Sequence, residues 1–169
     1  MFSSSGMWSF MVVSFWLTLR ISDSTTWVGI VTFSAMIPFL VISLFGGLIA
    51  DRFNRRKIIL IALLASSINS AVLAGLVLLG MIELWHIIAL TFCSGCLLAI
   101  QEPAIQSLIP NQIRREHLLN AITLHSATRH GAKFFGLLVS APLLAVGFID
   151  IGGVLVLSSL FYFIGSLHM

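Results

Sequence analysis

Long apolar runs separated by short polar turns make up most of the chain. Residues 27–50 and 58–81 each form a run without a charged side chain. Each run is about 24 residues long, which in helical form is roughly 36 Å, enough to cross the hydrocarbon core of a bilayer. The pattern therefore predicts a transmembrane helix over each run, and Pro38 predicts a kink in the first of them.

Four further apolar runs complete the pattern. They cover residues 7–19, 85–108, 120–147 and 151–167. The first holds only about 13 residues, whereas a full span needs about 20, so we expect it to be the second half of a helix and the chain to be a fragment. The predicted fold over residues 1–169 is all-α and integral to the membrane: a bundle of six transmembrane helices whose first helix is truncated.

The composition excludes a soluble globular domain. Hydrophobic residues make up 59% of the chain and charged residues 9%, whereas a soluble protein carries about 25% charged residues. The net charge of +3 does not indicate nucleic acid binding, because most of the basic side chains lie in two turns between apolar runs. Cys93 and Cys96 indicate neither a disulfide framework nor a metal site, since a metal would need further ligands. We expect them to be small packing residues.

The densest cluster of charge lies in the turn between the second and third runs. A turn this basic cannot lie in hydrocarbon, so we expect a tight loop at the membrane surface, on the cytoplasmic side. Gly47, Asp51 and Arg55 recur every four positions and would share one face if helical geometry continued around the turn. The candidate functional residues of this turn are Gly47, Asp51, Arg52, Asn54, Arg55 and Arg56.

This turn resembles the loop between the second and third helices of the major facilitator superfamily, whose pattern is G-x-L-a-D-r-x-G-R-r-k. The matching stretch reads Gly-Leu-Ile-Ala-Asp-Arg-Phe-Asn-Arg-Arg-Lys over residues 47–57. Asn54 replaces a glycine of the pattern, and asparagine is the next most tolerant residue of a left-handed backbone. A second basic loop, over residues 110–120, resembles the exporter branch that includes siderophore exporters. It matches there at Pro110, Arg115, Glu116, Leu118, Leu119, Asn120 and Ala121.

The resemblance implies the amino-terminal half of a twelve-helix secondary transporter that works by alternating access. It further implies a small-molecule substrate, export as the direction, the missing carboxy-terminal half as partner, and Asp51 as part of a cytoplasmic gate. No cofactor is expected. The excess of arginine and lysine in the two loops predicts a multi-pass protein of the inner or plasma membrane with its amino terminus in the cytoplasm.

Charged side chains inside the predicted spans are candidates for the substrate or coupling site. They are Glu102, His125, Arg129 and Lys133. An unpaired arginine at membrane depth costs at least ~2.5 kcal/mol, so we expect Arg129 to face a partner, Glu102 first, or a wet cavity. The surplus positive charge would suit an anionic substrate. The alternative is that the fifth helix starts later and these groups reach the lipid headgroups instead.

Two other classes of protein remain as alternatives. An intramembrane enzyme could draw on His125, His130, Glu102 and the two cysteines. The two histidines, however, lie roughly 140° apart around a helix, and no nucleophile has a base at matching spacing. A non-transporting membrane bundle is disfavoured by the intramembrane charges, which are costly and usually functional. Asn69 and the four-spaced small residues Ala62, Ser66, Ser70 and Ala74 predict helix packing rather than a site.

Overall fold

Helices form all of the regular structure that is described for this chain. The computed structural model describes residues 2–52, 54–112, 120, 122–124, 126–128, 130–132, 134 and 151–167. Its helices are α1 (Phe2–Ser22), α2 (Thr25–Arg52), α3 (Arg55–Leu78), α4 (Leu84–Gln112) and α6 (Ile151–Leu167). The all-α prediction is confirmed for these residues. The count of six spans is not tested, because much of the predicted fifth span lies outside them.

Within the described residues, three helical stretches are long and apolar enough to cross a membrane: Thr25–Ile42, Arg56–Leu78 and Leu84–Ser107. A shorter apolar helix runs over Gly152–Ser166. Large apolar side chains point away from the bundle on these helices, among them Phe33, which is 65% exposed, and Leu40, which is 64% exposed. An apolar surface of this extent is unfavourable in water and suits contact with lipid.

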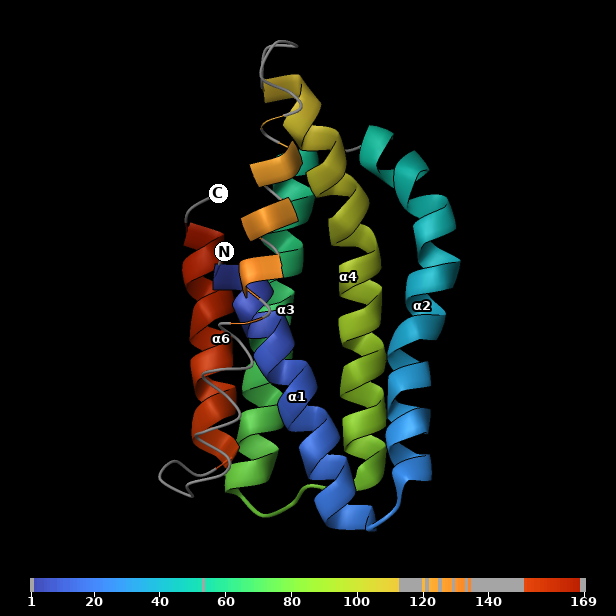
Figure 1. Cartoon of the computed structure of the whole chain (residues 1–169), viewed down its shortest axis with the longest axis vertical. Helices are drawn as coiled ribbons and strands as arrows, with labels where there is room; N and C mark the ends of the chain where they lie inside the picture. Colours follow the sequence, from blue (N-terminus) through green and yellow to red (C-terminus); the bar gives the residue numbers. More distant parts are fainter. Residues whose placement is uncertain are drawn as a thin grey trace.

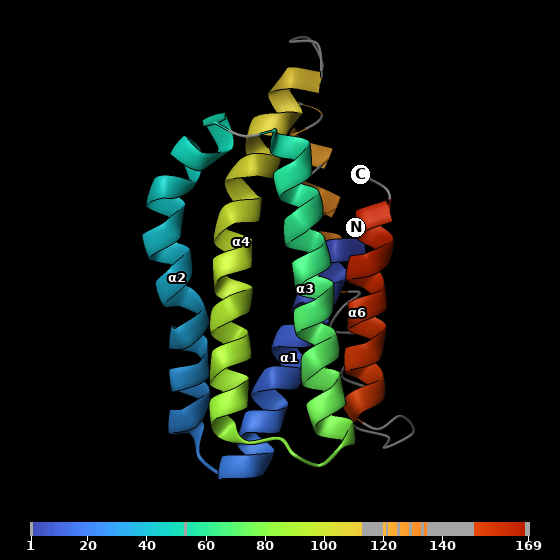
Figure 2. The same ribbon diagram turned by 180° about the vertical axis from the view of Figure 1, so that it is seen from behind.

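Four helices stand side by side in the order α2, α4, α3, α6, and α1 packs on one face of this row (Figures 1 and 2). Within the row, α2 packs against α4, α4 against α3, and α3 against α6. α1 contacts α6, α2 and α4. The turn from α1 to α2 and the turn from α3 to α4 lie at one end of the bundle, and the turn from α2 to α3 lies at the other (Figure 1). The predicted alternation of turns between two ends is therefore present in this part of the chain.

α1 is longer than the predicted span 7–19, because the serine-rich start of the chain is helical too. Hydroxyl groups towards the carboxyl end of α1 show how this helix tolerates polar residues. Ser14, Thr18 and Ser22 each donate to the carbonyl oxygen four residues earlier, at 2.8, 2.7 and 2.6 Å. A hydroxyl that bonds its own helix leaves no unpaired polar group, so serine and threonine need not end an apolar helix.

The ends of α3 differ from the predicted bounds 58–81, and local capping explains both ends. Asn54 precedes the first turn and caps it, so the helix starts at Arg55. At the other end Gly80 has a left-handed backbone with φ of 67°. The amide of Gly80 donates to the carbonyl of Val77, and that of Met81 donates to the carbonyl of Leu76. This pair of bonds is a Schellman cap, which stops the helix at Leu78.

α4 extends past the predicted end at residue 108 and includes Pro110, which the sequence placed in the second basic loop. A proline in the last turn removes only one helical hydrogen bond, close to the end where carbonyls can bond water. Figure 1 shows α4 reaching beyond the ends of α2 and α3. The rest of that loop, over residues 113–119, lies outside the described residues.

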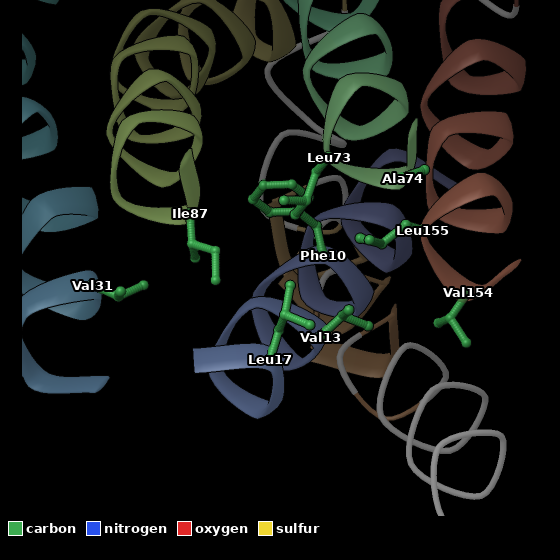
Figure 3. Packing of buried hydrophobic residues seen from close by; sticks show 9 residues of the cluster. All are labelled: Phe10, Val13, Leu17, Val31, Leu73, Ala74, Ile87, Val154 and Leu155. Atoms are coloured by element: carbon green, nitrogen blue, oxygen red, sulfur yellow. The ribbon is translucent and has the colours of Figure 1, made fainter. Parts of the chain in front are cut away.

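The main apolar cluster lies where five helices meet (Figure 3). α1, α2, α3, α4 and α6 all contribute buried side chains to it, and these are Phe10, Val13, Leu17, Val31, Leu73, Ala74, Ile87, Val154 and Leu155. In a membrane such contacts act through close packing rather than through exclusion of water. The cluster therefore fixes how α1 sits against the row of four helices.

Small and polar residues join the helices of the row, as predicted for α3. Ala62, Ser66, Ser70 and Ala74 are all buried. Ser70 donates through its hydroxyl to the carbonyl of Leu155 on α6 at 3.2 Å. The Asn69 amide donates to the carbonyl of Leu90 at 3.0 Å and to the Ser94 hydroxyl at 2.8 Å, both on α4. The interpretation as interhelical packing is confirmed for Asn69 and Ser70, which bond neighbouring helices.

Candidate functional site

The basic turn between α2 and α3 is short and starts the second helix directly. Asn54 has φ of −64° and ψ of 107°, an extended conformation, and its side-chain oxygen accepts a hydrogen bond from the backbone N–H of Arg56 at 3.2 Å. The prediction that Asn54 holds a left-handed position is wrong. Asparagine suits the site because it is among the best helix N-caps, and the extended backbone is the usual conformation of a cap.

The common face predicted for Gly47, Asp51 and Arg55 is not formed. Gly47, Asp51 and Arg52 belong to the last turns of α2, whereas Arg55 opens α3. The extended backbone at Asn54 interrupts the helical period between them. Gly47 and Asp51 therefore share one helix with each other but not with Arg55.

The charges of this turn do not all favour the helices that carry them. Arg52 lies at the carboxyl end of α2, where the helix dipole favours a cation. The first turn of α3 has no acidic residue and instead holds Arg55, Arg56 and Lys57, which the dipole disfavours. Lys57 is exposed. Basic residues at this place oppose helix stability, so a membrane surface gives the better reason for them.

A cavity of about 260 Å³ opens between α1, α2 and α4, with single residues from α3 and α6 at its wall. Its lining is mostly apolar and rich in aromatic and methionine side chains. α1 gives Met7, Trp8, Phe10, Met11 and Phe15, and α2 gives Val31, Ala35, Met36 and Phe39. Pockets with this kind of wall and a few polar groups are typical of binding sites for small organic molecules.

Most polar groups of the wall are bonded within the protein. The Ser66 hydroxyl donates to the carbonyl of Ala62 at 2.8 Å, and the Thr91 hydroxyl donates to that of Ile87 at 2.8 Å. Thr91 also lies 3.0 Å from the hydroxyl of Ser34 on α2. The contact between Ser34 and Thr91 joins α2 to α4 beside the cavity. The bonds to the helix carbonyls leave the hydroxyls of Ser66 and Thr91 less available to a ligand.

Glu102 is the one predicted site residue that the described part of the chain places at the cavity. It lies on α4 next to Gln101, which also lines the wall. His125, Arg129 and Lys133 lie outside the described residues, so the predicted pairing of Glu102 with Arg129 stays a prediction. Among the described residues of the wall there is no lysine or arginine.

Sequence reasoning missed the aromatic and methionine wall. Met7, Met11 and Phe15 recur every four residues, which places them on one face of α1, and Trp8 is their neighbour. This spacing was visible in the sequence. It carried no functional signal, because apolar residues at helical spacing also face lipid or a packed core.

In the stretch Cys93–Cys96, the residue that packs closely against another helix is the glycine. Both cysteines are free. Gly95 between them lies against α2: a Cβ at this position would overlap the carbonyl oxygen of Ala35 and stand 2.8 Å from Cγ of Pro38. Cys93 is exposed and Cys96 is partly buried, so the close contact is made by Gly95 and not by the cysteines to which the prediction referred. No group of three histidine, cysteine, aspartate or glutamate side chains within the described residues is arranged to hold a metal ion.

Comparison with known proteins identifies a family and a relative. Residues 1–166 match the model of the family described as transmembrane secretion effector, within the major facilitator superfamily. The chain is similar to a protein of Staphylococcus aureus (strain NCTC 8325 / PS 47) named Staphyloferrin A transporter, with 26% identity over 151 residues. That alignment covers 86% of this chain and 38% of the relative.

No solved structure matches the chain significantly. The apolar helices and the family match over nearly the whole chain both indicate a membrane protein of the transporter class rather than an enzyme. The chain spans only 38% of the length of the relative that it matches. This chain belongs to the transmembrane secretion effector family of the major facilitator superfamily.

Proposed function

We propose that this chain is one half of a secondary transporter that exports a small molecule across the cell membrane by alternating access. The observation that carries the proposal is the cavity between α1, α2 and α4, which holds the carboxyl-bearing Glu102 in a mostly apolar wall. An ionisable group at membrane depth is costly and is commonly retained for transport. A second helical bundle would close the cavity on its far side and complete the binding site.

The arrangement of the turns supports an orientation with the amino terminus in the cytoplasm. The basic turn between α2 and α3 lies at one end of the bundle, opposite the turn that follows Arg20 and Ser22 (Figure 1). Arginine and lysine are enriched on the cytoplasmic side of membrane proteins. We assign the basic end to the cytoplasm and the membrane to the inner or plasma membrane.

Asp51 is proposed as part of a cytoplasmic gate. It lies in the last turn of α2, one residue before the helix ends at Arg52. A negative charge at the carboxyl end of a helix is disfavoured by the helix dipole, so Asp51 needs a partner. That partner is expected in the second bundle, and its bond would close the cytoplasmic side when the cavity faces outward.

Glu102, Arg129, Lys133 and His125 are proposed as the polar centre of this half. Glu102 lines the cavity, and the other three follow from their spacing on the predicted fifth helix. The relative named Staphyloferrin A transporter supports small-molecule transport as the task. Since the chain spans 38% of that relative's length, the activity and substrate of the whole protein are proposals.

Two-sided labelling of the cavity tests alternating access without knowledge of the substrate. Met11→Cys, in a background with Cys93→Ala and Cys96→Ala, would be placed in the longer protein that joins this chain to a second bundle. A membrane-impermeant maleimide should label Met11→Cys from both sides of the membrane, because Met11 lines the cavity. Asn54→Cys, on the exposed basic turn, should be labelled from one side only. Labelling of Met11→Cys from one side alone would contradict the proposal.

A further inference from the structure

The cavity has one end that is richer in polar groups. α1 and α4 run in opposite directions, and Met7 near the start of α1 packs in the same cluster as Ala104, Ile105 and Tyr162 (Figure 1). Gln101 lies one helical turn before Ala104 and Ile105 on α4. Gln101 and Tyr162 therefore belong to the end near the start of α1, whereas Phe15 lies about two helical turns further along α1.

Gln101 and Tyr162 carry the unusual polar groups of this end. Gln101 is 8% exposed and Tyr162 is 7% exposed. Neither the Gln101 amide nor the Tyr162 hydroxyl makes a hydrogen bond to another described residue. Yet no fully enclosed side-chain nitrogen or oxygen in the described part of the chain lacks a partner. The two groups therefore face accessible space, and both residues line the cavity.

Other polar groups of the wall behave differently. The hydroxyls of Ser66 and Thr91 are bonded to carbonyls of their own helices, and Ser94 accepts from Asn69. The Gln101 amide and the Tyr162 phenol are instead left free to exchange hydrogen bonds with a molecule in the cavity, and a hydrogen bond between uncharged groups strengthens binding about three- to tenfold. An amide can donate and accept, and so can a phenol.

We infer that Gln101 and Tyr162 bind an uncharged polar group, such as a hydroxyl or carbonyl, of a ligand whose remaining body is aromatic or apolar. This inference rests on the proposed transport function and names its substrate class. Trp8, Phe10 and Phe15 supply flat apolar contacts for the body, and Met7 and Met11 adapt to its shape. A carboxylate would meet the Glu102 side chain in the same wall, and no described wall residue is cationic.

Three naphthalene probes with the same ring system test this assignment. They are 1-naphthalenemethanol, 1-methylnaphthalene and 1-naphthoate, which carry a hydroxyl, a methyl and a carboxylate group. Binding to the purified chain in nanodiscs is measured by equilibrium dialysis, with empty nanodiscs as the baseline. The alcohol should bind more tightly than the other two probes.

Variants that remove one polar group each locate the contact. Gln101→Met and Tyr162→Phe keep the size of the side chain and should each weaken binding of the alcohol about three- to tenfold, the range for one hydrogen bond between uncharged groups. Binding of 1-methylnaphthalene should change less than about twofold, which is below the worth of a hydrogen bond. Gln106→Met is the matched control, because Gln106 is exposed on the same helix, and it should change neither affinity.

Several results would overturn the inference. Equal losses for the alcohol and the methyl compound would show that the two residues only shape the fold. A carboxylate that binds tightest would show an anion site instead. Unchanged alcohol binding in both variants would leave the two groups as hydration sites only. These outcomes concern binding by this half alone, so they are distinct from failure of two-sided labelling, which would count against alternating access.

Discussion

Gly95 on α4 lies directly against the backbone of Ala35 on α2, so closely that a methyl group on Gly95 would overlap the Ala35 carbonyl oxygen. The ring of Pro38 follows one turn later, with Cγ 2.8 Å from the same point. A glycine is needed here because two helices approach each other more closely than any side chain permits. This contact positions two of the three walls of the cavity.

Replacing Gly95 should destabilise the bundle. We expect Gly95→Ala to lower the free energy of unfolding by about 1–3 kcal/mol, because the added methyl group forces α2 and α4 apart. Gly75→Ala on α3 is the control, since a Cβ there meets nothing within 4 Å. It should be neutral or stabilising by up to ~1 kcal/mol, as alanine is the better helix former. Unfolding in detergent monitored by circular dichroism measures both, and equal effects would contradict the close approach.

The N-cap role of Asn54 makes a prediction opposite to that of a left-handed turn. Asn54→Ala should cost about 1 kcal/mol of stability, because the bond to the Arg56 N–H is lost, whereas Asn54→Asp should retain it. Asn54→Gly should cost only a few tenths of a kcal/mol. Hydrogen exchange of the amides in the first turn of α3 reports the cap directly. A glycine variant more stable than the natural protein would favour the left-handed turn.

The bond between Asn69 and Ser94 should appear as a coupling energy. Asn69→Leu and Ser94→Ala each remove it, so the double variant should be less destabilised than the sum of the two. The expected coupling is about 0.6 kcal/mol and at most ~1.7 kcal/mol, as for other hydrogen bonds between membrane helices. Ser14→Ala replaces Ser94→Ala in the control cycle, because the Ser14 hydroxyl bonds only its own helix. Full additivity in both cycles would show that the Asn69–Ser94 contact contributes nothing.

Labelling from the two sides of the membrane tests the assigned orientation. In a background with Cys93→Ala and Cys96→Ala, Ser24→Cys should react with an impermeant maleimide added to intact cells. Asn54→Cys should react only after permeabilisation, because we assign the basic turn to the cytoplasm. Reaction of Asn54→Cys in intact cells would reverse the orientation.

Transport by the longer protein tests the polar centre. Glu102→Gln and Arg129→Ala should each reduce efflux of its substrate, and the double variant should be no worse than the more damaging single change. Groups that act as one unit are non-additive in this way. Glu83→Gln is the control, because Glu83 lies in the exposed turn before α4, away from the cavity. Losses that add in the double variant would mean that the two groups act separately.

The sequence was informative where the bilayer imposes strong rules. In a membrane protein a long uncharged run is explained by a spanning helix, and a basic turn is explained by a loop at the membrane surface. The helical bundle and the turn between α2 and α3 were therefore predictable. Helix ends depend on capping, which long apolar runs conceal. Gly80 was visible as a helix stop, and Asn54 was visible as a cap, but the family pattern drew attention to a left-handed position instead.

The wall of the cavity was harder to foresee, and Phe33 and Phe39 show why. Both are phenylalanines on α2, yet Phe33 is exposed on the outside of the bundle and Phe39 lines the cavity. Lipid and an aromatic cavity select the same kinds of side chain. Only the packing of α2 against α4 and α1 decides which phenylalanine faces the lipid and which faces the cavity. Glu102 was predictable because a carboxyl group is rare at membrane depth.

The hydrogen bonds between helices divide the bundle into mechanically unequal parts. Ser34 with Thr91, Asn69 with Ser94, and Ser67 with the carbonyl of Ser159 each tie one boundary of the row α2, α4, α3, α6. The hydroxyls of Ser14 and Thr18 on α1 are instead bonded within α1. In a rocking motion the four-helix row would move as one rigid unit. The part of α1 from Ser14 onward could shift along this row without breaking a hydrogen bond made by those hydroxyls.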